Sequence, residues 1–268
     1  MKIEELNKIY SDAVYQFGIF LKTYGNVEDE IFTIKTIHTY HVVSAAKEIA
    51  TALNLSKEDI LLAELIGLLH DIGRFEELSL KGELDNVKFN HAMCGSKMLF
   101  EDGLIRDFIK TNKYDEIIKV AIENHNKLKI ESGLDERTLL HCKIIRDADK
   151  FDNFRVIKEK PLSLINPKLI TKTEDISNSI ISEEVYNAFI EKRLVKNEDL
   201  KTPLDFYVKN LAFVFDINFD ITYKMIYNKK YIDVIINRFY IKDKVVRKQL
   251  EEIRKILDEF LFSCIKDK

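Results

Sequence analysis

Histidine and aspartate residues gather in short clusters between residues 38 and 149. Five of the six histidines of the chain lie in or beside these clusters. The clusters are His38-Thr39-Tyr40-His41, His70-Asp71, Asn90-His91, Asn124-His125-Asn126 and Asp147-Ala148-Asp149. Imidazole nitrogens together with carboxylate oxygens suit Fe, Mn or a similar divalent ion. The clusters therefore indicate a metal site, provided that the fold aims these side chains into one interior.

Helical periodicity recurs along most of the chain and predicts an all-α fold. The chain has only 8 Gly and 3 Pro among 268 residues, which leaves little material for β-turns. Helices are predicted at about residues 3–22, 34–52, 56–71, 90–101, 104–110, 115–125 and 136–157. Gly73 is expected to end the third of these, and residues 74–89 to form an irregular loop.

Two domains are predicted. Residues 1–157 would form the metal-binding helical domain, whose motifs span residues 38–149. Residues 158–181 contain Pro161 and Pro167 without a strong period and read as a connector. Helices at about 182–194, 203–214, 220–240 and 243–266 would then form a C-terminal helical extension packing on the first domain, as a dimerisation module, a partner-binding module or a lid.

The composition restricts the partners and the compartment. The 42 Lys and Arg nearly balance the 45 Asp and Glu, for a net charge of −3, so no nucleic-acid partner is expected. No apolar stretch approaches the roughly 18 residues of a membrane span, so no membrane is expected either. The three cysteines are widely separated and read as reduced thiols, which predicts a cytoplasmic protein. A homodimer stays open.

Three stretches resemble the HD-domain superfamily of metal-dependent phosphohydrolases. They are His38-Thr39 followed by Val42, Leu68-Leu69-His70-Asp71-Ile72-Gly73-Arg74-Phe75, and Asp147-Ala148-Asp149-Lys150. The resemblance covers about residues 30–157 and implies an HD-domain helical bundle. It implies that His38, His70, Asp71 and Asp149 are metal ligands. His91 and His125 match the two further histidines of the binuclear subgroup.

This ligand set implies one or two divalent ions, with Fe, Mn or a similar metal expected and Mg, Ni or Co also open. Asp71 could bridge two ions roughly 3.5–4 Å apart, and an activated hydroxide would then attack phosphorus. With one ion, His91 and His125 would bind phosphate instead. Asp147 competes with Asp149, and the alanine-aspartate pattern of the family favours Asp149.

Three further residues are candidates for substrate binding. Arg74 follows the metal motif and could hold a phosphate with its guanidinium fork, the alternative being a salt bridge to Glu76 or Glu77. His41 would either contact the substrate phosphate or support a ligand. Lys150 follows the metal aspartate and could also contact phosphate. Asp71 and Arg74 are the predicted catalytic pair.

The resemblance implies a small phosphorylated substrate, with a nucleotide as the leading class. No Gly-Tyr-Pro follows His125, unlike in cyclic-di-GMP phosphodiesterases, and Arg74-Phe75 replaces the Glu-Asp of guanosine tetraphosphate hydrolases. Symmetrical dinucleoside tetraphosphate hydrolases share the six-ligand pattern. Two alternatives stay open: a di-iron oxygenase on the same ligands, and a nucleotide-binding sensor.

Overall fold

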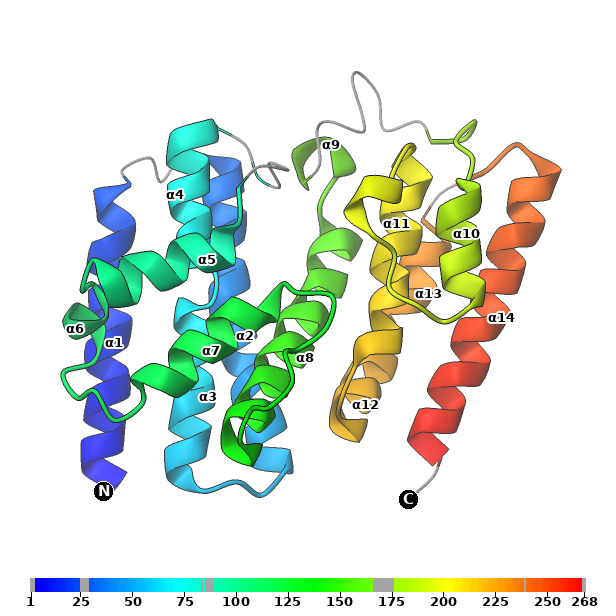
Figure 1. The fold of residues 1–268 in the computed structure, drawn as a ribbon. Helices are drawn as coiled ribbons and strands as arrows, with labels where there is room; N and C mark the ends of the chain where they lie inside the picture. Colours follow the sequence, from blue (N-terminus) through cyan, green and yellow to red (C-terminus); the bar gives the residue numbers. More distant parts are fainter. Residues whose placement is uncertain are drawn as a thin grey trace. The chain divides into compact units, whose positions relative to one another are not determined.

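The protein is all-helical, as the sequence predicts. The computed structural model describes residues 3–24, 29–82, 84, 89–165, 176–238 and 240–266, and within these ranges every regular element is a helix (Figure 1). Among these helices, none combines the length and the apolar character needed to cross a bilayer.

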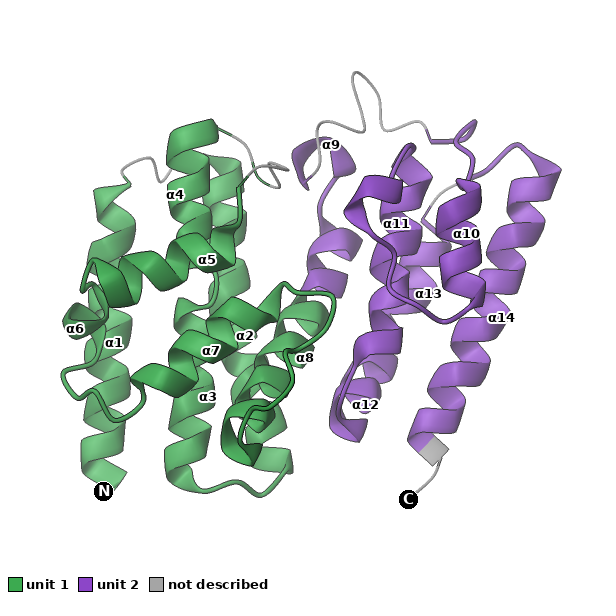
Figure 2. Ribbon diagram, viewed as in Figure 1, with its two compact units in different colours: residues 1–152 green, residues 153–268 purple. Residues whose placement is uncertain are grey.

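The chain divides into two compact units, residues 1–152 and residues 153–268 (Figure 2). The division falls inside one helix, α8 (Glu136–Glu159). The sequence-predicted domain limits, 1–157 and 158–268, and the packing of the extension on the first domain stay predictions.

The first unit carries every candidate ligand. Its helices before α8 are α1 (Ile3–Thr23), α2 (Glu30–Ala52), α3 (Lys57–Leu69), α4 (Ile72–Lys81), α5 (His91–Ser96), α6 (Ile105–Phe108) and α7 (Asp115–His125). A π-helical segment, Lys97–Glu101, continues α5. Helix α3 is the most buried helix of this unit, because every residue from Ile60 to Leu69 is buried. The one acid among these residues, Glu64, forms an ion pair with Lys47 at 2.7 Å.

Helix α4 corrects the loop expected at residues 74–89. Helix α3 ends at Leu69, Asp71 breaks the helical path with φ −106° and ψ 17°, and a new helix begins at Ile72. Phe75 fixes this helix, because its ring packs at centroid distances of 5.2–6.0 Å against Phe17, Phe20 and Phe32. Arg74 therefore lies in the first turn of a helix, and the left-handed Gly82 ends it.

Gly73 does not stop a helix but lets two helices touch. A Cβ atom built on Gly73 would lie 2.2 Å from the carbonyl oxygen of His91 and 2.7 Å from the amide nitrogen of Gly95. Both atoms belong to the backbone of α5, which cannot move aside as a flexible side chain could. The absence of a side chain at Gly73 thus brings the start of α5 against the start of α4.

The second unit contains the end of α8 and α9 (Leu162–Ile165), α10 (Glu183–Ile190), α11 (Pro203–Leu211), α12 (Asp220–Asn228), α13 (Tyr231–Ile236) and α14 (Lys244–Lys266). The helix expected at 220–240 is two helices, because Lys230 adopts a left-handed φ of 52°. The connector predicted at residues 158–181 begins within a helix, because α8 continues to Glu159. Residues 166–175 of this connector lie outside the described residues.

The buried carboxylate of Asp205 joins the starts of α10 and α11. It accepts hydrogen bonds from the amide and the hydroxyl of Ser182 at 2.7 and 2.6 Å. It also accepts from the amides of Lys201 and Thr202 at 2.9 Å each. These bonds compensate the loss of hydration of a carboxylate with no exposed surface.

A matched pair of glycine substitutions tests the contact at Gly73. Gly73→Ala should lower the free energy of unfolding by about 3 kcal/mol, because the methyl group meets backbone. Gly18→Ala is the control, since Gly18 is also helical and a Cβ there meets nothing within 4 Å. Alanine should stabilise α1 at that position by up to about 1 kcal/mol. Equal effects of the two substitutions in urea denaturation would contradict the close contact of α4 and α5.

Candidate metal centre

Four helices and one junction supply the six side chains predicted as ligands. His38 comes from the middle of α2 and Asp149 from α8. His70 and Asp71 form the junction between α3 and α4, where the helical path breaks. His91 is the first residue of α5 and His125 the last of α7. The five other than Asp149 are buried, and the side chain of Asp149 is 20% exposed.

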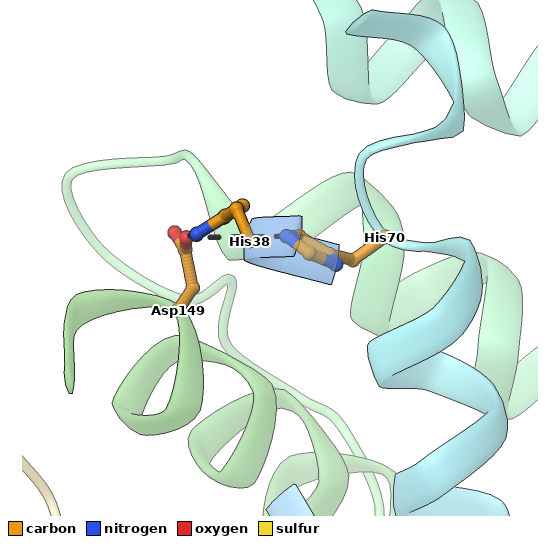
Figure 3. Close-up of side chains that lie close together, drawn as sticks. All are labelled: His38, His70 and Asp149. Carbon is orange, nitrogen blue, oxygen red and sulfur yellow. Dashed lines mark ion pairs between the residues drawn. The ribbon is translucent and has the colours of Figure 1, made fainter. Parts of the chain in front are cut away.

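The first group of potential ligands is His38, His70 and Asp149, whose side chains converge from three helical segments (Figure 3). Asp149 Oδ1 lies 3.1 Å from His38 Nε2 and 3.9 Å from His70 Nε2. All three donor atoms lie within 4.8 Å of one another, so a single ion could contact them together.

The second group is Asp71, His91 and His125. His91 Nε2 lies 3.1 Å from His125 Nε2. Asp71 Oδ1 lies 3.5 Å from His91 Nε2 and 3.7 Å from His125 Nε2. This group also has its donor atoms within 4.8 Å of one another.

Asp71 faces both groups, one oxygen to each. Its Oδ2 lies 3.8 Å from both His38 Nε2 and His70 Nε2, whereas its Oδ1 faces His91 and His125. A carboxylate in this position can bridge two metal ions. The six side chains thus form one continuous centre with two candidate ion positions.

Hydrogen bonds that Nδ1 donates orient three of the histidines. The Nδ1 atom of His70 donates to the Gly67 carbonyl at 2.8 Å, and that of His125 donates to the Ile122 carbonyl at 2.6 Å. His38 Nδ1 lies 2.7 Å from Asp152 Oδ2, a carboxylate oxygen that accepts its proton. Each bond turns Nε2 into the centre, which is the usual arrangement of metal-binding histidines.

The buried nitrogens match the donor set of a metal. His70 Nε2 is buried without a hydrogen-bond partner among the described residues. A buried polar atom without a partner is costly, and an ion in the first group would satisfy this nitrogen. The mixed nitrogen and oxygen donors suit Fe, Mn or similar ions, so the centre fits divalent metal.

The protonation states also suit metal binding. Burial raises the pKa of Asp71, but Lys35 and the neighbouring histidines outweigh it and hold this pKa well below its usual range. Burial also raises the pKa of Asp149, but the hydrogen bond from His38 and the charges of His38 and His70 together outweigh burial, so this pKa is lowered. Burial lowers the pKa of His70 to about 4 and that of His91 well below 6.5. Ionised aspartates and neutral histidines are the forms that coordinate metal.

His38 differs from the other two histidines. Burial and the positive charge of Lys35 lower its pKa, but the hydrogen bonds with Asp149 and Asp152 outweigh them, so that the pKa is raised. A metal ion would have to replace the interaction between His38 Nε2 and Asp149 Oδ1.

The residues predicted to bind substrate have different surroundings. Arg74 Nε lies 3.7 Å from Asp71 Oδ1, and its Nη1 donates to Glu77 Oε2 at 2.7 Å, so the salt bridge named as the alternative is formed. The side chain of His41 is 52% exposed, and its Nδ1 lies 3.5 Å from Asp152 Oδ1. Lys150 is buried and donates to the Arg146 carbonyl one helical turn back at 3.5 Å.

The sequence analysis missed two residues of the centre. Asp152 lies three residues after Asp149 on α8, and Lys35 lies three residues before His38 on α2. Residues three apart share a helix face, so this spacing was a usable signal. Lys35 Nζ lies 3.0 Å from Asp71 Oδ2.

Arg146 supports His125 from behind. Its guanidinium is buried and donates to the carbonyls of Asn124 and Lys127 where α7 ends. The last carbonyls of a helix lack partners within it, so this arginine satisfies them and fixes the end of α7.

The comparisons with known proteins identify one family model. Residues 36–153 match the model described as HD domain. The matched segment contains all six potential ligands and ends just after Asp152. No curated protein and no solved structure matches the chain.

Asp152 is expected to hold His38 in its metal-binding orientation. Asp152→Asn should weaken the affinity for Mn²⁺ about 10-fold to 100-fold, because the charged partner of His38 Nδ1 is lost. Glu159→Gln is the control, since Glu159 is an exposed acid of the same helix that pairs with Arg155. Isothermal titration with Mn²⁺ measures both variants. Wild-type affinity in Asp152→Asn would show that this carboxylate does not support the centre.

Proposed function

Because the chain belongs to the HD-domain superfamily through residues 36–153, we propose that it is a metal-dependent phosphohydrolase. Its substrate is a phosphoester or phosphoanhydride of a small molecule, with nucleotides as the first class to test. The observation that carries the proposal is the position of Asp71, with one carboxylate oxygen toward each group of potential ligands.

The ligand roles follow from this position. His38, His70 and Asp149 would hold one divalent ion together with Asp71 Oδ2, and His91 and His125 would hold the other together with Asp71 Oδ1. Two such ions supply a nucleophile from water near neutral pH and neutralise the charge of phosphate oxygens. Asp152 and the carbonyls of Gly67 and Ile122 keep the ligand histidines oriented.

Arg74 is the proposed phosphate contact of the chain. Its guanidinium lies beside Asp71 Oδ1, and Glu77, which has no exposed surface, fixes it from the other side. A planar guanidinium recognises phosphate through two parallel hydrogen bonds. His41, half-exposed beside Asp152, stays a second candidate contact. The proposal does not rest on Lys150, whose described hydrogen bond goes to its own helix.

The function is tested by metal analysis followed by a substrate screen. The Mn²⁺-loaded protein is incubated without oxygen with nucleotides, dinucleotides and sugar phosphates, and released phosphate and nucleoside monophosphate are measured. We expect hydrolysis of at least one substrate under these conditions. Turnover that requires ferrous iron and consumes oxygen would instead establish the di-iron oxygenase, and nucleotide binding without turnover would establish the sensor.

Two substitutions separate metal binding from substrate binding. Asp71→Ala should lower the metal content and abolish turnover, because it removes the carboxylate shared by the two groups. Arg74→Ala should keep the metal content and lower turnover about 10-fold to 100-fold for each phosphate hydrogen bond lost. Arg74→Lys should recover only part, since lysine lacks the planar fork. Wild-type kinetics in Arg74→Ala would show that Arg74 serves only as the partner of Glu77.

A further inference from the structure

Lys35 places a positive charge directly at the metal centre. It lies one turn before His38 on α2, and its Nζ is 3.0 Å from Asp71 Oδ2. Its side chain is 15% exposed, so most of it is enclosed beside the centre. The oxygen that it contacts also faces His38 Nε2 and His70 Nε2.

This contact creates an electrostatic conflict once metal binds. Asp71 Oδ2 belongs to the proposed first ion position, so a divalent ion and the ammonium group of Lys35 would share one carboxylate oxygen. Two positive charges at such short range repel strongly where water is largely excluded. A second anion, in addition to Asp71, that contacts both of them would reduce this repulsion.

Lys35 and Arg74 flank the same carboxylate. Lys35 contacts Asp71 Oδ2, and Arg74 Nε lies 3.7 Å from Asp71 Oδ1. Counting the groups joined by these contacts, the acids are Asp71, Asp149, Asp152 and Glu77, and the cations are Lys35 and Arg74. Two divalent ions would balance these four acids, so the two positive charges of Lys35 and Arg74 would remain, and a phosphate dianion neutralises two positive charges.

We propose that Lys35 is a substrate-binding residue, whose ammonium group contacts a phosphate oxygen beside Asp71 Oδ2 while Arg74 contacts the phosphate beside Asp71 Oδ1. The proposal rests on the proposed phosphohydrolase function and specifies it. The centre takes substrates that present a dianionic phosphate group, such as a terminal phosphate, and disfavours neutral substrates. Without substrate, Lys35 serves as the counter-ion of Asp71.

The test compares Lys35→Met, Lys35→Arg and the control Lys47→Met. Lys47 lies on the same helix and also pairs with a carboxylate, that of Glu64 at 2.7 Å. Isothermal titration measures the affinity and stoichiometry of Mn²⁺, and then the affinity of the Mn²⁺-loaded proteins for inorganic phosphate. Thermal unfolding shows that each variant folds.

We expect the loss of the Lys35 charge to change the affinities for Mn²⁺ and for phosphate in opposite directions. Lys35→Met should bind Mn²⁺ with unchanged stoichiometry and equal or higher affinity, because a competing cation is gone. Its affinity for phosphate should fall about 10-fold to 100-fold, the loss of one charge-assisted hydrogen bond. Lys35→Arg should stay within a few-fold of wild type for phosphate, and Lys47→Met should match wild type for both ligands.

Three results would overturn the proposal. Wild-type phosphate affinity in Lys35→Met would make Lys35 a counter-ion only, and loss of Mn²⁺ binding would make it a support of Asp71. A wild-type protein that binds no phosphate would also contradict it. If phosphate binding depends on Lys35 but no substrate is hydrolysed, the hydrolase proposal fails and the assignment of Lys35 stands.

Discussion

The centre depends on one buried carboxylate that must be compensated on every side. Asp71 has almost no exposed surface, and a carboxylate taken out of water is costly unless charges or hydrogen bonds replace its hydration. Lys35 and Arg74 lie beside its two oxygens, and the histidine rings of both ligand groups surround it. Lys35 and the neighbouring histidines keep the pKa of Asp71 low despite its burial. The same arrangement makes Asp71 available to two ions.

The position of Asp71 follows from how four helices pack. His70 and Asp71 lie in the short break between α3 and α4, and α3 is buried over its last ten residues. Gly67 allows α2 to approach α3, since a Cβ there would lie 3.1 Å from Val43 Cα. Gly73 allows α5 to approach α4 and so brings His91 toward Asp71. Gly67, one turn before the His70-Asp71 pair, and Gly73, two residues after it, thus allow the neighbouring helices to pack closely on both sides of the pair.

Around the ligands, a second layer of contacts restricts their motion. Asp152 holds His38, and the carbonyls of Gly67 and Ile122 hold His70 and His125. Arg146 closes the end of α7 behind His125, and Phe75 packs α4 against α1 and α2. Such supporting groups fix ligand orientation and raise metal affinity.

The sequence by itself determined the helical class and the chemical types at the centre. Periodicity and the scarcity of Gly and Pro were enough to predict the all-α fold. The stretches around His38, His70-Asp71 and Ala148-Asp149 were enough to predict the resemblance that the HD-domain match of residues 36–153 bears out. The tertiary structure alone decided that residues 72–81 form a helix, because the contacts of Phe75 that stabilise it come from α1 and α2. It alone showed that Lys35 and Asp152 reach the centre and which oxygen of Asp71 faces which histidines. The spacing of residues along the sequence determines which side chains share one face of a helix. Which other helix packs against that face depends on contacts between residues far apart in sequence, such as those 36 and 114 positions apart at this centre.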